Sequence, residues 1–293
     1  MAYVKELFFS QYGLRSGWRS LIFVVLFLAF AIPSGALAHR LIAGRNRDAL
    51  SLLADELAAA SSVLLATWIC ARFVERKPMT AFGLATRGMG RKLWIGALSG
   101  FLCLSLLIGV LDVFGAERLR GFSIHGSAIW HYAALWGLVF ALVGISEELI
   151  TRGYLLFTLT QGIGFWPAAI LLSAIFAAGH LHNPGEQWIG ITAAGLIGVM
   201  LAWSVWWTGS LWWAIGFHAA WDWAESYFYG VPDSGSVAEG HLLSSSARGA
   251  VWLSGGSTGP EGSIIVLPAV LLLVFIVWRA FPRTPPPSLE RLR

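Results

Sequence analysis

The stretch that decides the fold is residues 129–159, IWHYAALWGLVFALVGISEELITRGYLLFTL. Its first half is an apolar run of about the length, roughly 18 residues, that indicates a membrane-spanning helix. Its second half holds Glu147, Glu148 and Arg152, which are costly to place in a bilayer. We therefore expect a long spanning helix that carries ionisable side chains within the membrane.

The composition of the whole chain agrees with this interpretation. Apolar residues make up 57% of the 293 positions, charged residues make up 12%, and the mean hydropathy is +0.68. Because a soluble domain carries about 25% charged residues, this chain lacks the polar side chains to cover itself in water. The composition excludes the soluble globular class.

The apolar runs predict an all-α, polytopic transmembrane helix bundle of about eight spans. No polar linker divides the chain, so residues 1–293 are expected to form one domain. A long polar loop at 231–262 precedes the last span, and a Pro-rich tail follows at 282–293. The expected spans are residues 20–39, 50–73, 93–114, 129–159, 165–182, 187–208, 210–229 and 263–281.

The basic residues predict the orientation in the membrane. With eight spans, 14 of the 20 Lys and Arg residues fall on the side that holds both termini, and 6 fall on the other side. The positive-inside rule therefore places both termini in the cytoplasm. The net charge of +4 is distributed between apolar segments rather than over one face, so nucleic acid is not an expected partner.

Cysteine and tryptophan residues are expected to serve packing and anchoring. Cys70 and Cys103 lie within apolar runs without paired spacing, which is typical of small core residues. The Trp-rich stretches 203–213 and 221–223 lie around a short turn at 208–210. We expect these indoles to form an interfacial belt.

Three clusters of polar residues interrupt the apolar helices. An ionisable group inside a span costs about 2.5–3.5 kcal/mol on insertion scales and usually marks function. The clusters contain Glu147, Glu148 and Arg152; Phe176 and His180; and His218 and Asp222.

Helix geometry predicts that the three clusters meet. Glu148 and Arg152 are four residues apart on one helix face, as are His218 and Asp222 on another helix. A helix rises about 1.5 Å per residue, so Glu147 lies about 20 Å and His180 about 24 Å from the turn after the fourth span. His218 lies about 13 Å from the turn before the seventh span, which faces the same side. We expect them to converge at a similar depth.

These groups suit hydrolysis. A carboxylate beside an imidazole can deprotonate a water that attacks an amide carbonyl, and a second imidazole can donate to the developing oxyanion. This interpretation requires no cofactor. The same residues could instead bind Zn²⁺ through His180, His218 and a carboxylate from Glu147 or Asp222. The compact His-Glu-x-x-His motif, which would favour zinc strongly, is absent.

At these residues the chain resembles the CAAX protease and bacteriocin-processing (CPBP) family, which includes the Ras-converting CAAX endopeptidase. The family pattern is Glu-Glu-x-x-x-Arg, Phe-x-x-x-His and His-x-x-x-Asn or Asp. It occurs here at 147–152, 176–180 and 218–222, and the core resemblance covers about residues 81–228. The resemblance implies a single transmembrane protease domain with an active-site cavity open to one side.

The resemblance also implies a role for each residue. Glu147 with His180 would activate the water, and Glu148 with Arg152 would organise the site. His218 and Asp222 would face the tetrahedral intermediate. Family members often have Asn at the last position, and an ionised Asp222 would repel an oxyanion, so Asp222 must be protonated, orient His218 or bind a metal.

The loop at 231–262 is unusually long and polar for this chain. Its glycine-rich stretch 254–263 contains Glu261 just before the last span. The simpler interpretation is a glycine-rich linker. The alternative is a substrate lid or binding loop on the non-cytoplasmic side.

The predicted function is endoproteolysis of a membrane-anchored protein or peptide, near its C-terminus or beside a transmembrane segment. Compact loops favour a prokaryotic cell membrane. Two alternatives remain at this stage. An ion-coupled transporter would also keep ionisable groups at mid-membrane, although no internal repeat supports it. An inert membrane scaffold of the same fold would bind partners without catalysis.

Overall fold

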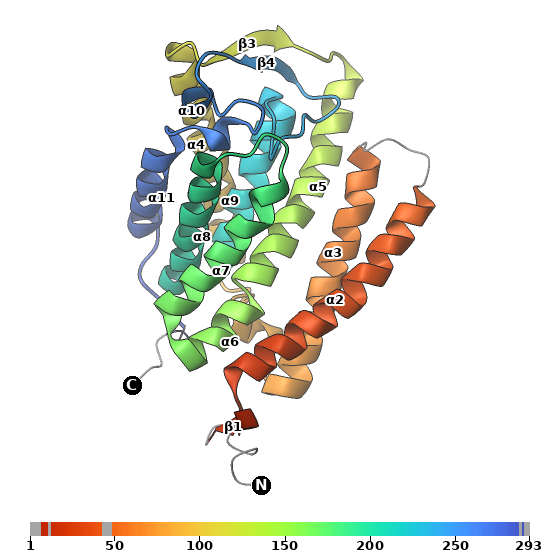
Figure 1. The fold of residues 1–293 in the computed structure, drawn as a ribbon, viewed down its shortest axis with the longest axis vertical. Coiled ribbons are helices and arrows are strands. Elements are labelled where there is room, and N and C mark those ends of the chain that lie inside the picture. Colours follow the sequence, from red (N-terminus) through yellow and green to blue (C-terminus); the bar gives the residue numbers. More distant parts are fainter. Residues whose placement is uncertain (1–6, 11–12, 43–48, 287–288, 290–293) are drawn as a thin grey trace.

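The computed structural model describes residues 7–10, 13–42, 49–286 and 289. Its α-helices, labelled in Figure 1, are α2 (Ser16–Leu41), α3 (Ala49–Ile69), α4 (Met89–Val113), α5 (Ser127–Thr151), α6 (Tyr154–Ile163), α7 (Phe165–Gly179), α8 (Trp188–Thr208), α9 (Trp212–Asp222), α10 (Val251–Ser254) and α11 (Val266–Ala280).

Short segments of other structure connect or extend these helices. Two are π-helical and three are 3₁₀-helical: η1 (Cys70–Glu75), η4 (Trp223–Tyr229), η2 (Met79–Phe82), η3 (His180–His182) and η5 (Pro260–Gly262). The strands pair as two antiparallel ribbons: β1 (Phe9–Ser10) with β2 (Gly13–Leu14), and β3 (Glu117–Phe122) with β4 (Leu243–Ala247).

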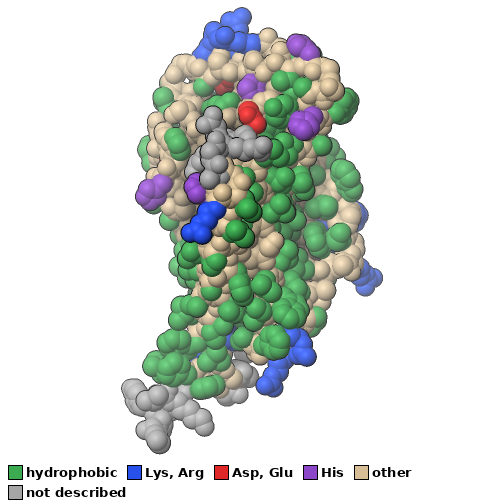
Figure 2. All heavy atoms as spheres, turned by 90° about the vertical axis from the view of Figure 1, so that its right-hand side faces the viewer, with side chains coloured by type: hydrophobic (Ala, Val, Ile, Leu, Met, Phe, Trp, Pro, Cys, Tyr) green, Lys and Arg blue, Asp and Glu red, His purple; other side chains and the backbone are tan. Residues whose placement is uncertain are grey.

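The protein is a multi-pass helical membrane protein, which confirms the predicted all-α class. In the described part of the chain, six helical segments are long and apolar enough to cross a membrane: 16–41, 49–75, 89–113, 127–163, 165–182 and 188–208. The expected spans at 210–229 and 263–281 correspond to α9 with η4 and to α11. Of these, α11 is a shorter apolar helix of 15 residues. Hydrophobic side chains are spread along the length of the face shown in Figure 2.

The two ends of the described bundle lie on one side. In Figure 1, α2 begins at the lower end of the view, and the segment after α11 descends to the same end. Hydrogen bonds hold this segment to the end of α8, where Trp207 Nε1 donates to the Phe281 carbonyl and Thr284 N donates to the Trp207 carbonyl. An even number of spans, as predicted from the sequence, would give this arrangement.

The fourth predicted span is broken rather than continuous. α5 ends at Thr151, Arg152 adopts a non-helical ψ of −5°, and Gly153 has φ −82° and ψ −123° before α6 begins. A Cβ atom at Gly153 would collide with the Leu149 carbonyl, so glycine permits the sharp turn. The break ends α5 one turn beyond Glu147 and Glu148.

Helix α9 lies at the centre of the bundle, and glycines let its neighbours approach it closely. A Cβ atom at Gly96 or Gly100 of α4 would meet backbone atoms of α9, and one at Gly216 of α9 would meet the Leu93 carbonyl of α4. On the other side, a Cβ at Gly144 of α5 would touch the Ile215 carbonyl. Small residues at such crossings are typical of membrane helix packing.

Several expectations about single residues can be compared with the structure. Cys70 and Cys103 are free and buried, as predicted. The interfacial assignment is wrong for Trp213 and Trp221, whose exposed fractions are 0% and 3%. Trp213 stacks on Phe217, with ring centroids 5.4 Å apart. Both residues belong to the buried hydrophobic core of the bundle.

The polar loop at 231–262 is largely structured. β4 pairs with β3 from Glu117↔Ala247 to Phe122↔Leu243, which ties the loop to the α4–α5 connection across the top of the view in Figure 1. α10 and η5 lie within its second half. The loop is therefore more than a glycine-rich linker.

The glycine crossing can be tested by adding one methyl group. Gly96→Ala is expected to destabilise the folded protein by about 1–3 kcal/mol, because the new Cβ must push α4 away from the α9 backbone. Thermal unfolding of the detergent-solubilised protein measures the effect. Gly109→Ala on the same helix is the control, since no atom lies within 4 Å of its Cβ position. Equal stability of the two variants would contradict the packing argument.

Candidate active site

The two adjacent glutamates of α5 lie in different environments. Consecutive helix residues are about 100° apart, so their side chains cannot face the same way. The Glu148 side chain is 0% exposed, and its Oε1 lies 2.9 Å from Arg152 Nη1. The Glu147 side chain is 40% exposed and lines a cavity. The buried Glu148 is thus part of an ion pair, while Glu147 is available to a ligand.

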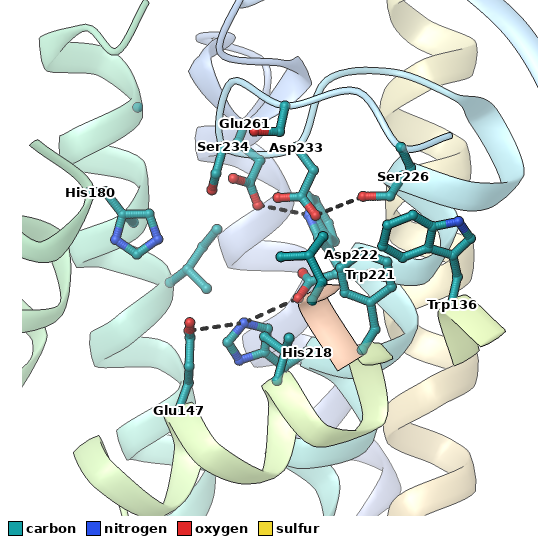
Figure 3. Close-up of a pocket in the computed structure, with 18 of the residues that line it drawn as sticks. Trp136, Glu147, His180, His218, Trp221, Asp222, Ser226, Asp233, Ser234 and Glu261 are labelled. Atoms are coloured by element: carbon teal, nitrogen blue, oxygen red, sulfur yellow. Dashed lines mark hydrogen bonds and ion pairs between the residues drawn. The ribbon is translucent and has the colours of Figure 1, made fainter. Parts of the chain in front are cut away.

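His218 of α9 connects these groups. Its Nδ1 lies 2.9 Å from Glu148 Oε1, while its Nε2 lies 3.5 Å from both Glu147 Oε2 and Asp222 Oδ2. Because Glu148 is paired with Arg152 and can only accept as a carboxylate, His218 Nδ1 donates to it. The imidazole is thereby oriented with Nε2 toward the cavity, between two carboxylates (Figure 3).

His180 lies at the end of α7, on a different wall of the same cavity (Figure 3). Its Nδ1 is 2.9 Å from the Phe176 carbonyl oxygen, which can only accept. Nδ1 therefore carries the hydrogen, and the neutral ring has its lone pair on Nε2. In the described structure no hydrogen bond joins His180 to Glu147 or His218; the three residues share the cavity.

Phe176 joins the second motif to the ion pair. The Arg152 guanidinium carbon lies 4.5 Å from the centre of the Phe176 ring, a cation–π contact. The same ring meets His218 edge-on, with centroids 6.3 Å apart and an interplanar angle of 85°. The spacing of Phe176 and His180 thus places one ring against Arg152 and His218 and the other on the cavity wall.

The cavity has a volume of about 290 Å³ and lies among α3, α5, α7, α8 and α9, beneath residues of the loop. Its polar lining includes Glu147, His180, His218 and Asp222. Apolar side chains line other parts of its wall, including Leu52, Trp136, Phe140, Val143, Ile197 and Leu201. The arrangement can place an apolar chain beside groups that activate water.

The structure brings further acidic residues to the cavity that the sequence interpretation did not select. Glu56 of α3 lines it and accepts a hydrogen bond from Ser146 Oγ at 3.1 Å. Asp233 and Glu261 reach it from the two ends of the loop. Glu56 could have been found as an ionisable residue inside an apolar span. Asp233 lies in a polar loop, where an acid is ordinary.

The predicted zinc ligands were compared with the geometry that one ion needs. Within the described residues, the compact sets of three metal-ligating side chains do not include His180 or His218. Zn²⁺ requires ligand atoms at about 2.0–2.2 Å from one centre, so these side chains would have to move to bind it together. We assign no step to zinc.

Comparison with known proteins gave one family. Residues 129–224 match the model of a family described as type II CAAX prenyl endopeptidase Rce1-like. The matched segment runs from the start of α5 to just beyond Asp222 and contains all three polar motifs. Neither the curated proteins nor the solved structures gave a match.

The buried ion pair predicts an asymmetric response to mutation. Arg152→Leu is expected to destabilise the protein by about 3–5 kcal/mol, because it removes the guanidinium that pairs with the buried, charged Glu148 and leaves it only the His218 hydrogen bond. Thermal unfolding in detergent measures the loss. The double variant Glu148→Leu/Arg152→Leu should recover a large part of it, since no buried charge is then left alone. A double variant less stable than Arg152→Leu would contradict this account.

Proposed function

We propose that this chain is an intramembrane endopeptidase that uses Glu147 to activate water. The premise is that residues 129–224 place the chain in the CAAX protease (CPBP) family. The observation that carries the proposal is the contrast between the two glutamates. Glu148 is enclosed by Arg152 and His218, whereas Glu147 projects into the cavity that His180 and His218 also line.

The proposed reaction begins with a water held between Glu147 and His180. One of these groups takes a proton as the water oxygen attacks the scissile carbonyl carbon. The lone pair on His180 Nε2 suits it to accept a hydrogen bond or a proton at this step. The proton then passes to the leaving amine as the C–N bond breaks, so the reaction needs no oxidant or second substrate.

His218 and Asp222 are proposed to face the tetrahedral intermediate. A protonated His218 Nε2 can donate to the oxyanion, and its other nitrogen is held by Glu148. Asp222, with Oδ2 3.5 Å from the same Nε2, orients the ring and competes for its proton. A protonated Asp222 could also donate to the intermediate, which removes the repulsion expected of a carboxylate.

The proposed substrate is a membrane-anchored protein or peptide, cut near its C-terminus or beside its transmembrane segment. The apolar lining of the cavity and its position among spanning helices support this class. A prenylated C-terminal CAAX segment, as in the family name, is one member of the class. The cytoplasmic placement of both termini is part of the same proposal and rests on the distribution of basic residues. The prokaryotic membrane is also part of it and rests on the short loops of the chain.

Cleavage by the purified protein tests the assignment. Glu147→Gln and His180→Ala are each expected to lower the rate on a membrane-peptide substrate by about 10²–10⁴-fold, the usual contribution of a positioned acid or base. The control is Asp55→Asn, which removes an exposed carboxylate from α3 outside the cavity lining. Unchanged cleavage in Glu147→Gln would remove the residue from the mechanism. Measuring cleavage in the presence of a metal chelator distinguishes a zinc mechanism, which the chelator would inhibit, from a glutamate mechanism.

Asp222 allows a sharper test. Asp222→Asn is expected to retain cleavage within about tenfold, because the amide keeps a partner for His218 and can donate to an oxyanion. Asp222→Ala should lose about 10²–10³-fold, since His218 then lacks one neighbour and the intermediate lacks a donor. Rates on one substrate at saturating concentration measure both. A loss in Asp222→Asn as large as that in Asp222→Ala would contradict this account and indicate that the carboxylate itself is required.

A further inference from the structure

A second group of carboxylates lies next to the candidate active site and has no part in the proposed mechanism. It consists of Glu225 in η4, Asp233 in the loop that follows, and Glu261 in η5; we call it the acidic triad. One oxygen from each carboxylate lies within 4.8 Å of the others. Three segments of the chain therefore bring negative groups to one point.

The acidic triad has little to balance its charge. No ion pair of the described residues includes any of its members. Glu225 is 0% exposed, and both of its carboxylate oxygens are buried without a hydrogen-bond donor. Isolated buried carboxylates are strongly unfavourable, so this side chain needs a partner that the described protein atoms do not supply.

Among the residues that the structure describes, two neutral groups donate to the other two carboxylates. Trp221 Nε1 donates to Glu261 Oε1 at 3.0 Å, and Ser226 Oγ donates to Asp233 Oδ2 at 2.9 Å (Figure 3). These contacts hold the carboxylates in place without neutralising them. Either protons or a cation must therefore compensate the acidic triad.

We propose that the acidic triad binds a divalent cation of the calcium type. Carboxylate oxygens are the ligands that Ca²⁺ prefers, at about 2.3–2.6 Å, and two ligands on opposite sides of one ion are then about 4.6–5.2 Å apart. The spacing of the triad fits this limit. Thiol and imidazole ligands, which would favour Zn²⁺, are not among the three residues.

Such an ion would fasten the loop over the cavity. Glu225 lies in η4, the π-helical segment that continues α9. Asp233 lies at the start of the loop, and Glu261 lies at its end. The two ends of the loop already meet, because Gly235 N donates to the Thr258 carbonyl at 2.9 Å. A Cβ atom at Gly259 would collide with the Pro232 carbonyl and approach Glu225 Oε1, so the backbone closes tightly around the triad.

Terbium(III), a luminescent substitute for Ca²⁺, tests the proposal on the full-length protein in detergent. Excitation of tryptophan should sensitise terbium emission, because Trp221 contacts Glu261 directly. The expected result is a saturable signal that Ca²⁺ displaces. Ca²⁺ should also raise the unfolding temperature by several degrees, since it binds the folded protein only.

Matched variants identify the site. Asp233→Asn and Glu261→Gln, alone and combined, should weaken terbium binding at least tenfold and abolish the thermal shift. Glu186→Gln removes a cavity-lining carboxylate outside the triad, and Glu147→Gln removes the proposed general base; both should keep the signal. Loss of proteolysis in Glu147→Gln with intact terbium binding would separate this site from catalysis.

Two results would overturn the proposal. One is that the wild-type protein unfolds cooperatively, and so is folded, but shows no saturable terbium binding at millimolar concentration. The negative charge of the triad would then be neutralised by protons rather than by a cation. The other is an equal loss of binding in Glu186→Gln or Glu147→Gln, which would place the ion elsewhere in the cavity. Size-exclusion profiles establish that each variant is folded before it is compared.

Discussion

The structure around the cavity depends on one ion pair, Glu148 with Arg152, held out of water in the middle of a helical bundle. A charge in such a place is tolerated only when its partner and hydrogen bonds are supplied by the protein. Glu148 receives both from Arg152 and His218. The pair therefore sets the direction of the His218 ring. Because Glu147 is the next residue on the same helix, the pair also leaves Glu147 turned toward the cavity.

Close helix packing makes this arrangement rigid. The glycines of α4 and α5 bring both helices against the backbone of α9, so His218 and Asp222 are held from two sides. The turn at Gly153 ends α5 just after Arg152 and lets the guanidinium lie over the Phe176 ring. Groups on α5, α7 and α9 thus share one cavity without needing a hydrogen bond between every pair.

The loop supplies a second electrostatic feature in the wall of the same cavity. Asp233 and Glu261 add negative groups next to Asp222, while β3 and β4 fasten the loop to the bundle. The proposed catalytic residues and the proposed cation ligands are different side chains. They are coupled through position, since a loop ordered by an ion would also shape the space that a substrate enters.

The sequence by itself determined the membrane class, the approximate spans and the three polar motifs, because apolar length and helical spacing are local properties. It also predicted that Glu148 and Arg152 pair, since residues four apart share a helix face. Only the tertiary structure decided that Glu147 is open while Glu148 is enclosed, that the fourth span breaks at Gly153, and that Trp213 is core. It also decided that Glu56, Asp233 and Glu261 join the cavity. Those outcomes depend on contacts between residues far apart in the chain, which neither composition nor periodicity contains.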